Sequence, residues 1–247
     1  MNVFVQGASR GIGLAFVRQL LDRPDVEVVF ASARQPERAS ALIDLEQEHG
    51  ARLQLVTVDV CSEAQIEASA AFVSERCARI HLLINAAGIL HGPEQQPEKR
   101  LEQVHAAALM HSFQVNAFAP LLTVKHFCPL LTHDERAVVA NISARVGSIA
   151  DNRLGGWYAY RGSKAAQNML TKTLSIELAR RAPNVICTAL HPGTVDTALS
   201  GPFQRNVPKQ RLFSPERATR QLLEVIDSLR PEDSGSFLAW NREPIPW

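Results

Sequence analysis

The sequence of 247 residues has almost no excess charge of either sign, because 26 Lys and Arg residues face 25 Asp and Glu residues. Non-specific nucleic-acid binding needs a concentrated positive field, so no nucleic-acid partner is expected. With 46% hydrophobic and 21% charged residues, the composition also excludes disordered, coiled-coil and collagen-like chains. A globular protein remains.

Long apolar runs and grouped cysteines are also missing. No segment approaches the roughly 20 apolar residues of a membrane span, and the first residues, MNVFVQGASRG, lack the regions of a signal peptide. The eight histidines show no metal-ligand spacing. We therefore expect a cytoplasmic protein with no membrane partner and no metal. The four cysteines form no CxxC pair and are expected to be small buried hydrophobic residues: Cys61, Cys77, Cys128 and Cys187.

What is present is a regular alternation of short β-branched runs with longer segments of helical pattern. Continuous apolar runs suit strands that are covered on both faces, as in a parallel sheet. The alternation predicts one α/β domain over residues 1–247, with a doubly wound parallel sheet of about seven strands and helices on both faces. The predicted strands are residues 2–5, 26–31, 53–58, 81–85, 137–142, 185–190 and 234–240.

Two helix starts are marked by their capping residues. Ser62 with Gln65 forms the pattern of a capping box. Ser214 is followed by Pro215, and proline is favoured at the first position of a helix. Both sites predict helices that begin directly after these serines.

A glycine-rich turn follows the first predicted strand, with Gly7, Gly11 and Gly13 before an apolar helical pattern. Glycine permits a tight turn and a close approach of the backbone to a pyrophosphate. The helix N-terminus then offers unpaired N–H groups to that anion. The turn predicts a dinucleotide site, although such turns also serve as plain strand-to-helix connections. Its candidate contacts are Gly7, Ser9, Arg10, Gly11, Ile12 and Gly13.

The residues beyond this turn bear on which dinucleotide is preferred. In dinucleotide-binding folds, a carboxylate about 20 residues further on marks the ribose 2′-OH of NAD. Counting from Gly13 reaches Ala33, and no acidic residue comes before Glu37. Arg34 lies where an arginine can face a 2′-phosphate, and Arg10 can join it. NADP(H) is therefore expected over NAD(H); the alternative is that the Arg34 side chain only extends from the strand end into water.

Tyr160 and Lys164 are four residues apart in a long predicted helix, so their side chains share one face. A neighbouring ammonium favours the phenolate, and we expect it to lower the pKa of Tyr160 from its ordinary value of about 10. The phenol can then exchange a proton with a carbonyl or alcohol oxygen while hydride moves at carbon. Tyr and Lys four residues apart are common on helices, so this pair indicates a catalytic site only in combination with the glycine turn.

Together these motifs resemble the short-chain dehydrogenase/reductase family over nearly the whole chain. The resemblance implies a Rossmann-like fold in which Tyr160 is the general acid/base and Lys164 tunes it and holds the nicotinamide ribose. It also implies a homodimer or homotetramer. The further matches are Asp59 and Val60 at the adenine ring, Asn85, Ala86 and Gly88 in an NNAG-like run, Asn116 at a proton-relay water, and Pro192, Gly193, Val195 and Thr197 around the nicotinamide carboxamide.

One departure from the family pattern concerns the catalytic serine, because Ala144 occupies its usual place. Ser143 is adjacent and Ser148 follows closely, so Ser143, Ser148 or no serine polarises the carbonyl. Adjacent strand residues point to opposite faces, and Ser143 needs a local twist to take the role. A second departure is Gln6, where the family usually has threonine before the glycine turn.

An insertion at residues 151–156 and the C-terminal run FLAWNREPIPW resemble the C-factor/sniffer-like carbonyl reductase branch. The predicted function is NADPH-dependent reduction of a small-molecule carbonyl compound to an alcohol, or the reverse. The alternative is an NAD(P)-binding signalling or regulatory protein with weak or no catalysis, which Ala144 supports.

The segments left to define a substrate are a loop at about residues 198–215 and the tail 236–247. A loop in this position is a usual place for motion that gates the site. Its basic residues either lie in solvent or favour an anionic substrate, whereas its apolar residues suit an apolar carbonyl compound. The basic residues are Arg205, Lys209 and Arg211, and the apolar ones are Leu199, Phe203, Leu212 and Phe213.

Overall fold

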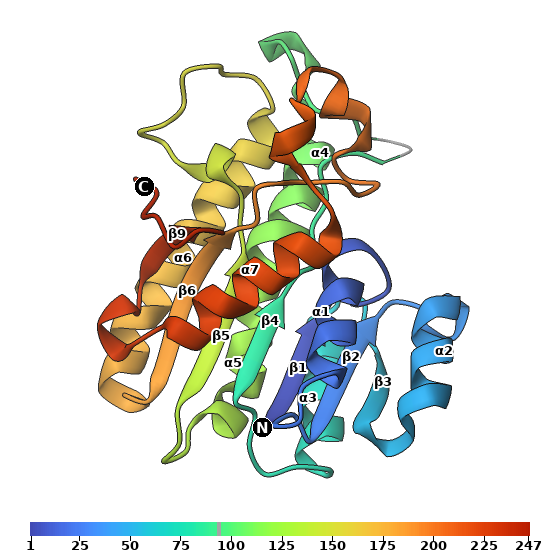
Figure 1. Ribbon diagram of the computed structural model, residues 1–247. Helices are drawn as coiled ribbons and strands as arrows, with labels where there is room; N and C mark the ends of the chain where they lie inside the picture. Colours follow the sequence, from blue (N-terminus) through green and yellow to red (C-terminus); the bar gives the residue numbers. More distant parts are fainter. Residues whose placement is uncertain (93–94) are drawn as a thin grey trace.

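The computed structural model describes residues 1–92 and 95–247 and contains a seven-stranded sheet of order β3-β2-β1-β4-β5-β6-β9 (Figure 1). Every ladder of this sheet is parallel, and the strand order reverses between β1 and β4. The predicted doubly wound sheet is confirmed. Its strands are β1 (Asn2–Gln6), β2 (Val28–Ala33), β3 (Leu53–Thr57), β4 (Leu82–Asn85), β5 (Ala137–Ile142), β6 (Val185–His191) and β9 (Ser236–Ala239).

Helices cover both faces of the sheet, as the alternation of the sequence predicts. Val3 and Val5 pack into one apolar core, and Phe4 between them packs into the other, because successive strand residues face opposite sides. The first core includes α1 (Gly11–Leu21), α2 (Ser40–His49) and α7 (Pro215–Ser228), and the second includes α3 (Glu63–Ser74), α5 (Ala119–Leu131) and α6 (Tyr158–Arg181). Figure 1 shows α1 and α7 in front of the sheet and α3 and α5 behind it.

The two predicted helix starts are confirmed, but one of them differs in detail. The hydroxyl of Ser214 accepts a hydrogen bond of 3.2 Å from the Arg217 N–H at the start of α7. The Ser62 hydroxyl likewise accepts from the Gln65 N–H at 3.4 Å. The Gln65 side chain, however, accepts from the Asp59 N–H at 2.7 Å, so the reciprocal half of the predicted capping box is absent. Asp59 lies beyond the end of β3, where its N–H has no strand partner.

The expectation of buried cysteines holds only for Cys187, because Cys61, Cys77 and Cys128 are half-buried; all four are free. Cys77 and Cys128 lie at the margin of the second core, where helix surfaces meet water. Among the helices of residues 1–92 and 95–247, none is both long and apolar enough to cross a membrane.

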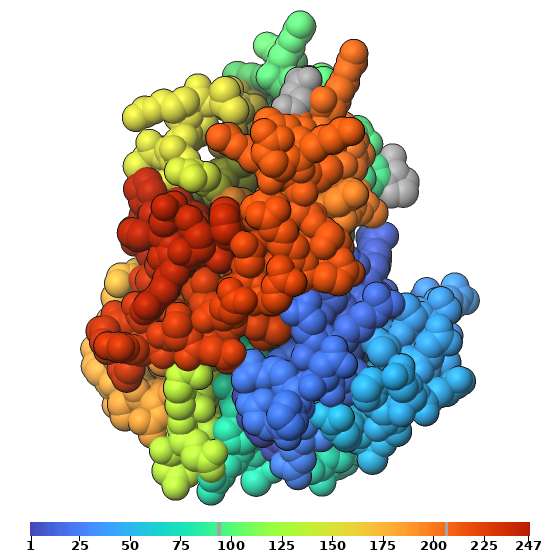
Figure 2. All heavy atoms as spheres, viewed as in Figure 1, coloured from blue at the N-terminus to red at the C-terminus, as the bar shows by residue number. Residues whose placement is uncertain are grey.

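The carboxyl ends of the strands meet at one edge of the sheet, and three long segments gather there. They are residues 86–92 and 95–105 after β4, residues 143–157 after β5 and residues 192–213 after β6. In Figures 1 and 2 the last of these (orange) covers this end of the molecule beside the loop of residues 143–157 (yellow). A short parallel pair, β7 (Thr194–Val195) with β8 (Leu212–Phe213), joins the two ends of the orange segment, and no pattern in the sequence predicted it.

Candidate active site

The glycine turn is held in a shape that only glycine can adopt. Gly7 and Gly11 have φ values of +80° and +57°, in the left-handed region. A Cβ atom on Gly7 would lie 2.6 Å from the Ala87 nitrogen, and one on Gly13 would lie 2.1 Å from the Gly7 carbonyl oxygen. The turn therefore brings β1, the start of α1 and the segment after β4 into direct backbone contact.

The start of α1 is open to an anion. Arg10 occupies the N-cap position without a side-chain capping bond, and the first turn contains no acidic residue. The first N–H groups of a helix have no partner within the helix, so they are available to a negatively charged group. Ser9 and Ile12 are half-exposed here, and Arg10 is exposed. This cradle fits a pyrophosphate.

The candidate ribose and adenine contacts lie at the ends of two paired strands. Arg34 is exposed directly after β2, and Asp59 and Val60 are half-buried after β3. The register aligns Ala33 with Thr57, so the two strand ends are adjacent. The Asp59 carboxylate accepts a hydrogen bond of 3.0 Å from the Cys61 N–H, which fixes the turn after β3. The structure therefore places Arg34 beside these predicted adenine contacts.

The segment after β6 closes against the glycine turn. A Cβ on Gly11 would lie 3.3 Å from the Thr197 methyl carbon. Gly193, after Pro192, has φ +79°, and a Cβ there would lie 2.8 Å from the Phe213 ring. Val195 is buried in β7. The predicted pyrophosphate and carboxamide contacts therefore lie on facing segments.

Tyr160 and Lys164 lie in the first two turns of α6 and are both buried, with 9% and 3% of their surfaces exposed. The Lys164 Nζ atom lies 5.9 Å from the centre of the Tyr160 ring, so the shared face is confirmed. This ammonium donates to the Ile142 carbonyl at 2.8 Å and to the Gln167 side-chain oxygen at 2.9 Å. Lys164 is thus tied to the end of β5.

Burial sets the protonation of this pair. It raises the pKa of Tyr160 above its ordinary value, and it lowers the pKa of Lys164 to about 7. The predicted lowering of the Tyr160 pKa is therefore wrong for this structure, because loss of hydration dominates and the Lys164 hydrogen bonds go to Ile142 and Gln167. Tyr160 keeps its proton at neutral pH, as a proton donor requires.

Asn116 lies in a π-helical turn, Gln114–Phe118, between α4 (Ala106–Phe113) and α5. Its buried side chain accepts from the Ile89 N–H at 2.8 Å and donates to the Ile89 carbonyl at 2.9 Å and the Ser163 hydroxyl at 3.0 Å. A Cβ on Gly88 would lie 3.5 Å from Asn116 Oδ1 and 3.9 Å from Lys164 Nζ. The π-helical turn thus joins the segment after β4 to α6 through the Asn116 side chain.

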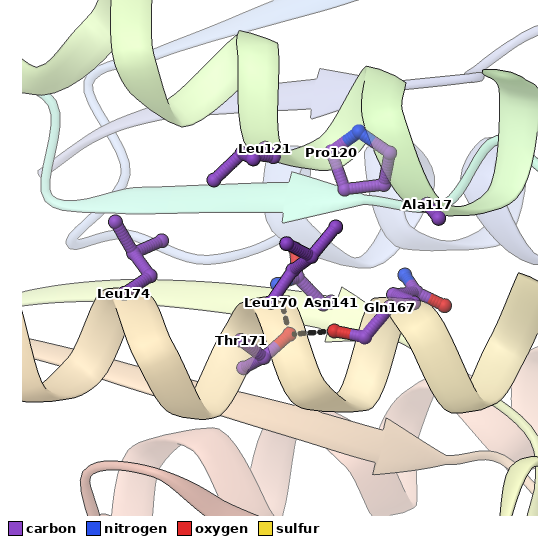
Figure 3. A pocket seen from close by; sticks show the side chains of 8 residues that line it. All are labelled: Ala117, Pro120, Leu121, Asn141, Gln167, Leu170, Thr171 and Leu174. Carbon is purple, nitrogen blue, oxygen red and sulfur yellow. Dashed lines mark hydrogen bonds between the residues drawn. The ribbon is translucent and has the colours of Figure 1, made fainter. Parts of the chain in front are cut away.

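Below Lys164, a buried polar network links the sheet to α6. Figure 3 shows Thr171 bonded to Asn141 and to the Gln167 carbonyl, each at 2.8 Å. The Asn85 amide donates to Asn141 Oδ1 at 2.7 Å. The Asn85 side chain, a predicted cofactor contact, therefore points into this network, while Ala86 and Gly88 follow at the edge. Gln167 and Thr171 were missed, although they lie three and seven residues after Lys164 on the same helix face.

Both candidate serines are engaged in structural hydrogen bonds. The Ser143 hydroxyl donates to Asn168 Oδ1 at 2.6 Å, and the backbone stays extended through Ala144, so the two side chains face opposite ways. The Ser148 hydroxyl accepts from the Asp151 N–H at 3.1 Å and donates to the Trp247 carbonyl at 3.5 Å. The twist that Ser143 needed is not found.

A series of aromatic contacts starts at Tyr160 and runs through Trp157 and Phe203 to His91. The Trp157 ring lies 6.3 Å from the Tyr160 ring and 5.0 Å from the Phe203 ring, measured between ring centres. The Phe203 ring lies 5.7 Å from the His91 ring, whose Nε2 atom is 3.0 Å from the Ala198 carbonyl. Trp157 and His91 were missed by sequence reasoning; the position of Trp157 three residues before Tyr160 was the available signal.

Comparisons with known proteins agree with this geometry. The family model described as short chain dehydrogenase matches residues 1–208. The NADPH-bound carbonyl reductase from chicken fatty liver superposes with a TM-score of 0.89 at 34% identity, over 100% of this chain and 98% of that chain. The carbonyl reductase Sniffer of D. melanogaster gives 0.89 at 28% identity, over 100% and 99%. The C-signal protein of Myxococcus xanthus is 35% identical over 178 residues, which cover 72% of this chain and 99% of that protein.

Proposed function

The chain belongs to the short-chain dehydrogenase family, and from that premise we propose that it uses NADP(H), in preference to NAD(H), to reduce a small carbonyl compound to an alcohol or to run the reverse reaction. The observation that carries the proposal is the convergence of Tyr160, Lys164 and Gly88 at the sheet edge where α1 begins uncapped. The likeness to Sniffer and C-signal supports the branch indicated by the sequence.

The cofactor is assigned to the glycine turn and to the facing residues 192–197. In this proposal the first N–H groups of α1 hold the pyrophosphate, and Arg34 with Arg10 holds the 2′-phosphate. The bound NADPH of the chicken carbonyl reductase supports the choice of nicotinamide cofactor. When bound, the cofactor supplies the hydride that is added to the carbonyl carbon. The remaining proposed contacts are Gly7, Ser9, Gly11, Ile12, Gly13, Asp59, Val60, Asn85, Ala86, Gly88, Pro192, Gly193, Val195 and Thr197.

Tyr160 acts as the proton donor to the carbonyl oxygen. Its raised pKa keeps the hydroxyl protonated until the oxygen gains negative charge. Lys164, with a pKa of about 7, can return a proton, and Asn116 fixes the segment beside it. Ser143 polarises the carbonyl only if it exchanges its bond to Asn168, so Tyr160 carries most of the electrostatic assistance.

Replacement of Tyr160 tests the proposal. We expect Tyr160→Phe to lower kcat about 10²–10⁴-fold and to leave NADPH affinity unchanged, since only the hydroxyl is removed. Tyr158→Phe is a matched control, because Tyr158 is the other tyrosine of the chain, is 43% exposed, and should change neither quantity. NADPH oxidation and fluorescence titration measure the two effects. Full turnover by Tyr160→Phe would contradict the assignment.

A second candidate function, cofactor binding without efficient catalysis, is supported by Ala144 and by the engaged hydroxyl of Ser143. It predicts tight binding of NADPH with no turnover of aldehydes, diketones or quinones. The same titration followed by a substrate screen separates the two functions: turnover of any of these classes supports the reductase.

Self-association into a homodimer or homotetramer belongs to the same proposal. It is supported by large apolar side chains exposed on α4, the π-helical turn and α6. Sedimentation of the purified protein measures the assembly size, and lysine at one of these positions should dissociate it. The exposed residues are Met110 at 66%, Phe118 at 42%, Met169 at 66% and Ile176 at 54%.

A further inference from the structure

Trp157, at the start of the catalytic helix, has an unusual backbone conformation. Its φ and ψ are 53° and 45°, in the left-handed region, and it follows Gly155 and Gly156 with φ values of 62° and 65°. A bulky side chain seldom adopts this conformation, which persists only where surrounding groups fix it. Groups around Trp157 must therefore hold it in place.

Glu98 supplies the holding contacts. Its carbonyl accepts a hydrogen bond of 2.5 Å from the Trp157 N–H, and its carboxylate accepts one of 3.3 Å from the Ala159 N–H. Glu98 is only 2% exposed, and the helix has no side-chain cap of its own. A carboxylate also opposes the positive end of the helix dipole. One residue, 59 positions before Trp157, thus sets the first turn of α6.

The conformation of Trp157 directs its indole toward the reaction site. The indole meets the Tyr160 ring at 70° and the Phe203 ring at 62°, both edge-to-face contacts. In the proposed reaction the carbonyl oxygen binds at the Tyr160 hydroxyl. Trp157 is the ring in contact with Tyr160, so a substituent on that carbonyl is placed against the indole. Phe203 belongs to the segment of residues 198–215, so the aromatic contact also joins that segment to α6.

We propose that Trp157 is a specificity-determining residue that favours aryl over alkyl substituents on the carbonyl substrate, and that Glu98 is the residue that positions it. The inference rests on the proposed reductase function. Ring contacts of this kind exceed equivalent apolar contacts by an amount that corresponds to about 2- to 12-fold in kcat/KM. His91 supports Phe203 from the opposite side.

The test compares kcat/KM for acetophenone with that for cyclohexyl methyl ketone, using NADPH and the full-length enzyme. Trp157→Leu should lower the ratio of the two values about 2- to 12-fold, and Trp157→Phe should retain most of it, because a ring remains. Phe72→Leu is the control, since the Phe72 ring lies in α3 against the Arg76 guanidinium, outside both segments expected to define the substrate, and should leave the ratio unchanged.

Glu98 is tested by a pair of variants. Glu98→Ala removes the side-chain acceptor for the Ala159 N–H but keeps the carbonyl that binds the Trp157 N–H, so it should lower the ketone ratio by less than Trp157→Leu does. Glu98→Gln keeps an acceptor oxygen and should restore the ratio. A purely structural role for Glu98 would lower turnover of both ketones equally and leave the ratio intact, which would overturn its positioning role.

The outcomes separate this inference from the proposed function. A wild-type enzyme that reduces both ketones, with a ratio unaffected by Trp157→Leu, overturns the role of Trp157 and leaves the reductase function standing. A wild-type enzyme that binds NADPH and reduces no carbonyl compound overturns both.

Discussion

The glycine turn at residues 7–13 and the entry to α6 at residues 143–160 lie at the same edge of the sheet but are built in opposite ways. In the turn, missing side chains decide the geometry, since a Cβ on Gly13 has only 2.1 Å to the Gly7 oxygen. At the helix entry, distant side chains decide it: the Ser143 hydroxyl donates to Asn168, and the Glu98 carboxylate accepts from the Ala159 N–H near Trp157. A site formed by backbone is local in sequence, whereas one formed by side chains depends on partners far along the chain.

The largest expected effect on this contrast comes from adding one methyl group to the glycine turn. Gly13→Ala should lower NADPH affinity at least about 100-fold, equivalent to about 3 kcal/mol, because the turn must open to admit the Cβ. Gly201→Ala is the control, since a Cβ there meets nothing within 4 Å. Fluorescence titration measures both variants. Wild-type affinity in Gly13→Ala would show that the turn adapts easily.

At the helix entry, Lys164 should make stability depend on pH. Its pKa is lowered to about 7 in the folded state, so between pH 7 and its unfolded value of about 10.4 the unfolded chain binds more protons. Stability therefore rises with pH, by about 2 kcal/mol from pH 7 to 9. Lys164→Met should remove this rise. Urea unfolding at pH 7, 8 and 9 measures it, and parallel curves for the two proteins would contradict the burial argument.

Replacement of Arg34 tests whether NADPH affinity depends only on the backbone of the glycine turn or also on a side chain. If its guanidinium binds the 2′-phosphate, Arg34→Ala should weaken NADPH binding about 10-fold, because a charge-assisted hydrogen bond contributes about 1.5–3 kcal/mol. NADH affinity should not change. Titration with both cofactors measures the effect, and Arg38→Ala, an exposed arginine four residues later, serves as control. Equal losses for NADPH and NADH would refute this role for Arg34.

The smallest expected effect concerns Ser143. Because its hydroxyl bonds to Asn168, Ser143→Ala should cost about 1 kcal/mol of stability and change kcat less than about threefold. Thermal unfolding and NADPH oxidation measure the two quantities. A fall in kcat near 100-fold would show that the hydroxyl leaves Asn168 and acts on the substrate.

The same contrast explains what the sequence could predict. The strands were predictable because they are continuous apolar runs, in which successive residues such as Val3 and Phe4 pack into the cores on opposite faces of the sheet. The glycine turn and the shared face of Tyr160 and Lys164 follow from local sterics and helix geometry. The family resemblance is confirmed by the match over residues 1–208, whereas the individual site roles stay predictions.

What the sequence could not predict depends on burial and on distant partners. The direction of the Tyr160 pKa shift requires the degree of burial, which no local pattern contains. The Gln65 side-chain oxygen accepts from the Asp59 N–H, so the half of the capping box in which Gln65 would bind the Ser62 N–H is absent. The contact between Glu98 and Trp157 spans two loops, and neither residue has a pattern that names the other.

The two-residue strands β7 and β8 have a consequence for protein engineering. Val195 and Phe213 are register partners and pack in one apolar cluster with Ala218, against Ile12 at the start of α1, so the pair anchors both ends of the segment between them. Loops grafted between them to alter substrate choice should retain Thr194–Val195 and Leu212–Phe213 unchanged. A graft that cuts into either strand would remove this anchor and change the contact with α1 together with the loop.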